Sequence, residues 1–310
     1  ISDERNQPFV VAQIAPPSTA VNKIGQDVRR RLAVADGDAY RTPKAVLRRT
    51  RADDTDDWID LAVPAPPAGD SIVVLFRLRN SLLNTILLYD IMLGDPGARS
   101  LDWVGQDLRQ VGPAVELAQW YQRRMGMDIA VLDQGRWRAV AHLKDTGPVA
   151  WKDVAIAIPA LQADPVRIRL KFPADNWRID RVAIAPRFRR LPAGPVVRPL
   201  STVLDALERV DTSASASMAA ADERYLEVAS GQRFTAQFEA GAPAGDSLRT
   251  FFLASQGYYT EWVRNGWLRA PRANRTFTPS DAALAEAIQR WQVTQDTLEA
   301  RFMATRVPVR

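Results

Sequence analysis

Acidic residues are the first candidates for chemistry in this sequence. Five aspartates lie close together, a density that could supply several of the six to eight oxygen ligands that calcium needs. Their spacing matches no EF-hand loop and no glycine stands at the turn, so a solvated acidic loop is the alternative that we favour. We expect either no cofactor or a calcium ion held by Asp53, Asp54, Asp56 and Asp57, with Asp60 the fifth member of the cluster.

A second acidic pair, Asp175 and Asp180, flanks Trp177. Two carboxylates beside an aromatic ring could serve as the acid and base of glycoside hydrolysis. Arg178 and Arg181 stand beside them, however, and an arginine next to a carboxylate more often forms an ion pair. We therefore expect structural ion pairs here, with a glycoside-active enzyme as a lesser alternative.

His142 is the single histidine, and it alternates with apolar residues in a predicted strand. One histidine cannot build a multi-histidine metal site, and the sequence has no Gly-x-Ser-x-Gly motif that would accompany a serine nucleophile. The chain has no cysteine, which excludes thiolate catalysis and cysteine-ligated metals. No glycine-rich nucleotide motif occurs either. We expect a structural role for His142 and a protein that is not an enzyme.

An aromatic segment near the C-terminus is the predicted binding site. Trp, Tyr and Arg dominate binding hot spots because they offer large contact areas at low entropic cost. The alternative is that these rings fill the core of a small module. The predicted binding residues are Tyr258, Tyr259, Trp262, Arg264 and Trp267.

The elements that would position these residues are mainly strands. Residues 166–172 alternate apolar and basic side chains, the pattern of a strand with one buried face. Residues 58–64, 72–78 and 89–93 resemble 151–159, 166–172 and 179–183, with Asp90 matching Asp180. This similarity predicts an internal duplication. The expected fold is mainly β (α+β), with two duplicated jelly-roll-like β-sandwich units.

Helices and turns complete the expected organisation. Pro113 and Gly126 delimit a helical insert, and a hairpin should follow around Gln134 and Gly135. A terminal helix should begin near Thr278 with Pro279 in its first turn. We divide the chain into an N-terminal arm with a short helix (1–50), a first β-sandwich repeat with the insert (51–147), a second repeat (148–190), a linker (191–221) and a C-terminal β module with a helix (222–310).

Part of the chain resembles a known group of proteins. Residues 224–228, 231–235 and 251–262, and less closely 166–185 with its Trp177-Arg178-Ile179-Asp180 run, resemble a C-terminal β-rich module of bacterial cell-envelope proteins. Those proteins carry FG-GAP and ASPIC/UnbV-like segments, as in cartilage-acidic-protein-like chains, or tetratricopeptide repeats. The resemblance covers about half of the chain and implies an extracytoplasmic, interaction-type role without catalytic residues. Neither repeat type is present in this sequence.

Composition restricts the function classes further. The 310 residues carry 41 Lys and Arg against 36 Asp and Glu, a net charge of +5 that favours anionic partners but is too small to indicate nucleic acid. The apolar stretch 72–93 is interrupted by charges, so we expect no transmembrane segment. The chain begins at Ile1, which fits a processed or a trimmed N-terminus. The leading hypothesis is a bacterial, periplasmic or surface-associated accessory or scaffold subunit of an envelope or membrane-protein assembly. A carbohydrate-binding protein stabilised by calcium is the alternative.

Overall fold

The computed structural model describes residues 9–65, 71–159, 164–185, 187–191, 196–204, 209–220, 222–229, 232–241, 251, 253, 255–257, 265–266 and 276–305. The chain divides into two compact units. The larger comprises Ile1–Pro192 and Val263–Arg310, and the smaller comprises Ala193–Trp262.

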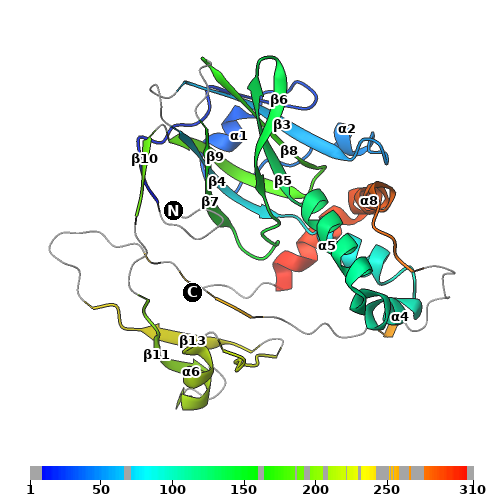
Figure 1. Ribbon diagram of the computed structural model, residues 1–310, viewed down its shortest axis with the longest axis vertical. Helices are drawn as coiled ribbons and strands as arrows, with labels where there is room; N and C mark the ends of the chain where they lie inside the picture. The colour runs from blue at the N-terminus through cyan, green and yellow to red at the C-terminus, as the bar shows by residue number, and fades with distance from the viewer. Residues whose placement is uncertain are drawn as a thin grey trace. The chain divides into compact units, whose positions relative to one another are not determined.

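Two antiparallel sheets form the centre of the larger unit (Figure 1). Their facing sides share one apolar core, to which Ile59, Phe76, Leu170 and Ile179 belong, so the two sheets form a β-sandwich. The five-stranded sheet contains, in order, β2 (Thr19–Asn22), β3 (Asp56–Val63), β8 (Val166–Pro173), β5 (Met127–Asp133) and β6 (Arg136–Leu143). The three-stranded sheet contains β7 (Lys152–Ile158), β4 (Ile72–Asn80) and β9 (Trp177–Ala185).

A two-stranded ribbon packs on the outside of the three-stranded sheet. Strands β1 (Phe9–Ala12) and β10 (Arg187–Arg190) pair with each other in antiparallel fashion. Val11 and Phe188 of the ribbon contact an apolar patch that includes Leu75 and Ala183. The described part of the predicted N-terminal arm (1–50) thus contains β1, because the outer side of β4 and β9 is apolar and needs a cover, and β2 of the five-stranded sheet.

Helices build a second core at one end of the sandwich (Figure 1). Leu83, Trp103, Trp120 and Trp291 belong to this core, which therefore joins segments far apart in the chain. The helices of this unit include α1 (Arg29–Ala33), α2 (Lys44–Leu47), α3 (Leu83–Thr85), the π-helix η1 (Ile86–Met92), α4 (Arg99–Gly105), the 3-10 helix η2 (Asp107–Arg109), α5 (Val111–Met125) and α8 (Asp281–Thr305). No helix in the described ranges is long and apolar enough to cross a membrane.

The mainly β class and the jelly-roll-like sandwich are confirmed, but the prediction of two duplicated units is wrong. Strand β3 pairs with β8, and β4 pairs with both β7 and β9, so both proposed repeats contribute to the same two sheets. Asp90 lies in the π-helix and Asp180 in β9, which are not matching sites. The duplication fails because three strands of one proposed repeat cannot bury enough apolar surface by themselves. Strands of the other segment pair with them and cover that surface.

Helix and strand were also confused at residues 89–93. Across α3 and the π-helix, the buried residues Leu83, Ile86, Leu87 and Ile91 recur at the three- and four-residue spacing of a helix. By contrast, the predicted insert is confirmed as α5, which ends before Gly126. The hairpin of β5 and β6 is confirmed as well, with positive φ angles of 48° at Gln134 and 78° at Gly135, as a two-residue hairpin turn requires.

Helix α8 belongs to the larger unit, whereas the sequence analysis assigned it to the C-terminal module (222–310). It begins at Asp281 after Ser280, whose side chain accepts a hydrogen bond from the Ala283 N–H, so Ser280 rather than Thr278 is the cap. Leu284 and Ile288 pack into the helical core of this unit. In the sequence, Leu284, Ile288 and Trp291 recur at helical spacing and predict one apolar side of the helix. The sequence did not show which surface that side packs against.

In its described residues, the smaller unit has a three-stranded sheet of order β12-β11-β13 and one helix. Its elements are β11 (Pro199–Leu204), β12 (Arg209–Val210), α6 (Thr212–Met218) and β13 (Phe234–Phe238). The expected linker (191–221) thus contains strands β11 and β12 as well as helix α6, which Asp211 caps by accepting a hydrogen bond from the Ala214 N–H. The sequence predicts a hairpin of residues 225–228 with 234–238, which is wrong: β13 pairs with β11, and residues 225–228 do not form a strand. The sequence also predicts a strand at residues 250–253, of which only 251 and 253 are among the described residues.

Candidate functional site

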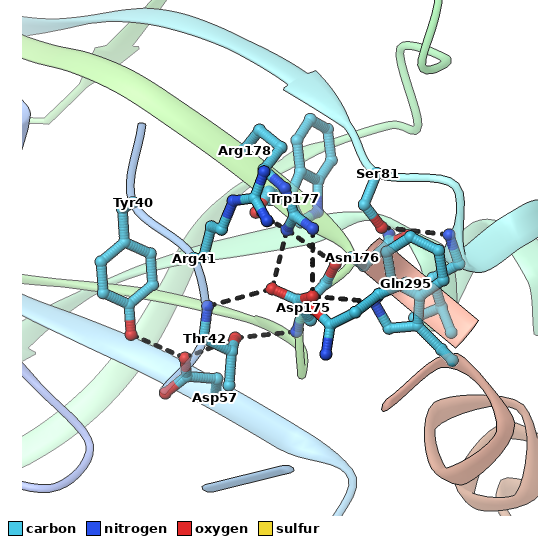
Figure 2. Close-up of polar contacts among 12 residues, drawn as sticks. Tyr40, Arg41, Thr42, Asp57, Ser81, Asp175, Asn176, Trp177, Arg178 and Gln295 are labelled. Carbon is cyan, nitrogen blue, oxygen red and sulfur yellow. Dashed lines mark hydrogen bonds and ion pairs between the residues drawn. The ribbon is translucent and has the colours of Figure 1, made fainter. Parts of the chain in front are cut away.

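A buried polar network lies where the sandwich meets helix α8 (Figure 2). Asp175 stands in the turn between β8 and β9 with a positive φ of 60° and is 1 % exposed. Its carboxylate accepts hydrogen bonds from the backbone N–H of Thr42 (3.1 Å), from the guanidinium of Arg178 (2.7 and 3.0 Å) and from the Trp291 indole N–H (2.7 Å). Both oxygens are therefore occupied by protein donors.

Arg178 joins two chain segments through this network. Its guanidinium also donates to Glu299 of α8 at 2.8 Å, and the other oxygen of Glu299 lies 2.6 Å from Arg41. Burial tends to lower the pKa of Arg178, but the negative charges of Asp175 and Glu299 outweigh it and raise that pKa. The arginine therefore stays charged and ties the terminal helix to the sandwich.

Asp57 of β3 forms a second buried contact beside this one. Its carboxylate accepts from the Tyr40 hydroxyl and the Thr42 hydroxyl, both at 2.7 Å, and from the Trp58 N–H at 2.8 Å. Burial raises the pKa of Asp57 in spite of these hydrogen bonds, which lower it. Burial and the neighbouring Asp57 also raise the pKa of Tyr40. Because Thr42 touches both carboxylates, the two contacts form one structural unit.

Replacing Asp57 by asparagine tests the consequence for stability. A carboxyl group with a raised pKa binds its proton more tightly in the folded chain than in the unfolded one, where its pKa is about 3.9. The free energy of unfolding of the wild type should therefore fall as pH rises from about 4 through the raised folded value. Asp57→Asn should lack this decline. Urea unfolding of both proteins from pH 4 to 8 measures it, and two curves that stay parallel would contradict the assignment.

Asp175 and Asp180, for which ion pairs were predicted and acid–base catalysis was the lesser alternative, both lie beside arginines. Asp175 is enclosed as described, and Asp180 accepts from the Gly37 N–H at 2.8 Å and lies 3.5 Å from the Arg77 guanidinium. The interpretation of these aspartates as ion-pair partners is confirmed for Asp175 with Arg178 and for Asp180 with Arg77. An oxygen that already accepts two protein donors has little capacity left for a substrate proton.

The aspartates of the acidic cluster point to different partners. Asp54 pairs with Lys23 at 2.6 Å, Asp56 with Arg124 at 3.0 Å, and Asp60 with Arg169 at 2.7 Å. Asp57 turns inward to Tyr40, and Asp53 is exposed. The described residues contain no group of three or more acidic or histidine side chains arranged to hold a metal ion. These carboxylates mainly balance nearby basic side chains.

His142 lies on β6 at the outer side of the five-stranded sheet. Its Nδ1 is 2.7 Å from Asp128, and its Nε2 is 2.9 Å from the carbonyl oxygen of Gln122. Both ring nitrogens therefore have partners, which agrees with the structural role expected from the sequence. The predicted binding residues Tyr258, Tyr259, Trp262, Arg264 and Trp267 lie outside the described residues.

The outer side of the five-stranded sheet carries a ladder of rings and cations that sequence reasoning missed. Lys23 lies over the Trp58 ring at 4.8 Å from its centroid, and the Arg169 guanidinium lies 4.9 Å from Trp58 and 4.3 Å from Trp137. Asp60 holds Arg169 through two hydrogen bonds of 2.7 Å. We call Lys23, Trp58, Arg169 and Trp137 the cation–aromatic ladder.

Strand register brings the ladder together. Asp60 of β3 lies opposite Arg169 of β8, which lies opposite Ala130 of β5. The small side chain of Ala130 leaves space across which Arg169 reaches Trp137 on the edge strand β6. The alternation in 166–172 assigned Arg169 to the wet face, but its neighbours depend on strand order, which is why the ladder was not predicted.

The ladder is a half-exposed surface with recognition groups around it. Both tryptophans are half-buried, whereas the side chains of Lys171 and Asp128 are 47 % and 49 % exposed. Such a face combines apolar ring surface with donors and acceptors. Of the features in the described residues, this one is the better candidate for a binding site, because the buried network has its polar groups engaged internally.

Comparison with known proteins found no matching family model and no matching curated protein. Solved structures gave distant likenesses. An allantoicase structure aligns with 58 % of this chain and 40 % of its own length, at 12 % identity and a TM-score of 0.28. The C-terminal CBM6 of the laminarinase LamC from Zobellia galactanivorans aligns with 58 % of this chain and 99 % of its own, at 10 % identity and a TM-score of 0.22. A CBM6 module of Cellvibrio mixtus lichenase 5A in complex with cellotriose aligns with 57 % of this chain and 98 % of its own, at 11 % identity and a TM-score of 0.22.

Proposed function

We propose that this protein is a non-catalytic glycan-binding β-sandwich whose site is the outer face of the five-stranded sheet. The cation–aromatic ladder carries the proposal, because it is the half-exposed aromatic surface on the sandwich with charged groups on both sides. Trp137, on the edge strand β6, is where a sugar ring would stack. Asp60 and Arg169 hold each other in place and keep the ladder rigid.

Charge around the ladder favours an acidic glycan. Arg167, Arg169 and Lys171 alternate along the outer side of β8, and Arg169 and Lys171 have carboxylate partners in Asp60 and Asp56. Arg167 is exposed and adds a charge without an ion-pair partner among the described residues. A polyuronate would meet this positive strip with its carboxylates, and its binding would weaken as salt rises. A glycan ligand also fits an extracytoplasmic location.

Replacing Trp137 by alanine tests the site. Affinity for polyuronate oligosaccharides, measured by calorimetry beside neutral β-glucan oligosaccharides, should fall at least tenfold, which is the loss of a hot-spot ring worth roughly 2 kcal/mol. The matched control is Trp151→Ala, since Trp151 lies against Arg79 at 5.1 Å but borders the other sheet. Equal affinities of wild type and Trp137→Ala would place the site elsewhere, and a wild type that binds neither glycan class would overturn the proposal.

An accessory subunit is the second candidate. Helices α4 and α5 expose four aliphatic side chains: Leu101 (41 %), Val104 (48 %), Val111 (78 %) and Val115 (45 %). Such a surface suits a protein partner in an envelope assembly. A partner that copurifies in stoichiometric amount from the native source and is lost in Val111→Asp, without any glycan binding, would favour this candidate over the first.

A further inference from the structure

A pocket of about 310 Å³ lies between the β1–β10 ribbon and the outer face of the three-stranded sheet. Val10, Val11 and Ile14 line it on the ribbon side, and Leu75 lines it on the sheet side. Its other end is polar, with Arg77, Asp153 and Arg181. The pocket therefore has one apolar and one charged end, and its volume is in the range of small-molecule sites.

Strand register orders the charged end. Asp153 of β7, Arg77 of β4 and Arg181 of β9 lie opposite one another in a row across the sheet. Arg77 has two acidic neighbours, because Asp153 accepts its hydrogen bond at 2.9 Å and Asp180 lies 3.5 Å from its Nε. Arg77 is thus already compensated, and it separates Asp153 from Arg181.

Arg181 is the cation that the pocket leaves available. Its Nε is buried and has no hydrogen-bond partner among the described residues, and no acidic residue of these ranges pairs with it. A buried donor without a partner costs free energy that an acceptor would recover. A carboxylate is the acceptor that matches the planar guanidinium fork best, since it can take two parallel hydrogen bonds.

We propose that this pocket binds a small amphiphilic carboxylate, with its carboxylate on Arg181 and its apolar tail under the ribbon. The tail would cover Val10 and Ile14, which are 45 % and 43 % exposed. This site lies on the sheet opposite the cation–aromatic ladder and does not depend on the proposed glycan site. It would give the protein a second ligand of a different chemical class.

Calorimetry with three probes tests both ends of the pocket. Octanoate has the charge and the tail, octanamide has the tail without the charge, and acetate has the charge without the tail. The wild type should bind octanoate at least tenfold more tightly than either of the others. Arg181→Met should weaken octanoate binding at least tenfold and leave octanamide binding unchanged. The matched control is Arg48→Met, an exposed arginine at the end of α2, which should bind octanoate like the wild type.

The same measurements can overturn the proposal. It fails if the wild type does not bind octanoate, if octanoate and octanamide bind equally, or if folded Arg181→Met keeps the wild-type affinity. Circular dichroism establishes that the variants are folded. Arg181→Gln serves as the second variant, since it keeps a polar side chain while removing the charge, and it should show the same loss for octanoate.

Discussion

Arg178→Met is expected to lower the free energy of unfolding by about 3–5 kcal/mol, the usual cost of removing one partner from a buried ion pair. Arg178 and Asp175 are each 1 % exposed at their side chains. The substitution would leave the Asp175 carboxylate buried with only the N–H groups of Thr42 and Trp291 to satisfy it. It would also remove the contact to Glu299 that ties α8 to the sandwich.

Arg290→Met is the matched control, because Arg290 also forms ion pairs but lies on α8 and is partly exposed to solvent. Arg290 forms ion pairs with Asp95 at 2.6 Å and with Glu286 at 2.5 Å, but its side chain is 35 % exposed. Solvent screens such pairs, so we expect a cost below about 1 kcal/mol. Urea unfolding followed by circular dichroism measures both variants. If both substitutions lowered the free energy of unfolding by similar amounts, the buried network would not stabilise the fold more than an exposed ion pair does.

Trp291→Ala is the second substitution with a large expected effect. The ring is fully buried in the helical core, and truncation of a buried tryptophan costs about 3–5 kcal/mol. It would also remove the indole N–H that donates to Asp175. Helix α8 should then separate from the unit and unfold more readily, so trypsin should cleave faster after Arg290 and Arg301. Urea unfolding and limited digestion read by mass spectrometry detect the two effects.

Two further variants separate packing from hydrogen bonding. Trp291→Phe keeps an aromatic ring but leaves the Asp175 oxygen without its donor, so an intermediate loss of about 1–3 kcal/mol is expected. Val293→Ala alters a residue of α8 that is 85 % exposed and should change stability by less than about 0.5 kcal/mol. The assignment of α8 to the larger unit is contradicted if Trp291→Ala unfolds like Val293→Ala and resists trypsin to the same degree.

Local patterns were sufficient for several elements. Residues 166–172 alternate in sequence and form β8 with the apolar side chains inside, because a strand places successive side chains on opposite faces. The turn at Gln134 and Gly135 was predictable because the hairpin needs positive φ angles there, which glycine adopts easily. The insert helix α5 was predictable from its spacing and its flanking glycine.

Other features required partners that lie far away in the chain. The similarity of 58–64 to 151–159 looked like a repeated unit, although β3 and β7 lie in different sheets of one sandwich. Both segments are strands with one buried side, and many arrangements satisfy such a pattern equally well. The spacing of the aspartates likewise did not reveal their partners. Lys23, Arg124 and Arg169 come from separate elements and each pairs with a different aspartate, so these carboxylates do not converge on one calcium site.

The sequence by itself determined which residues are apolar on one side of a strand or helix, and hence the β-rich class, the hairpin and the apolar seam of Leu284, Ile288 and Trp291. Only the tertiary structure decided what each of those sides packs against. It brought Asp175, Arg178 and Glu299 into one buried network, stacked Arg169 between two tryptophans, and left the Arg181 Nε without a partner in the described residues. The reason is that side-chain periodicity is a local property of the chain, whereas strand order and helix docking depend on contacts across more than a hundred residues, as between Arg178 and Glu299.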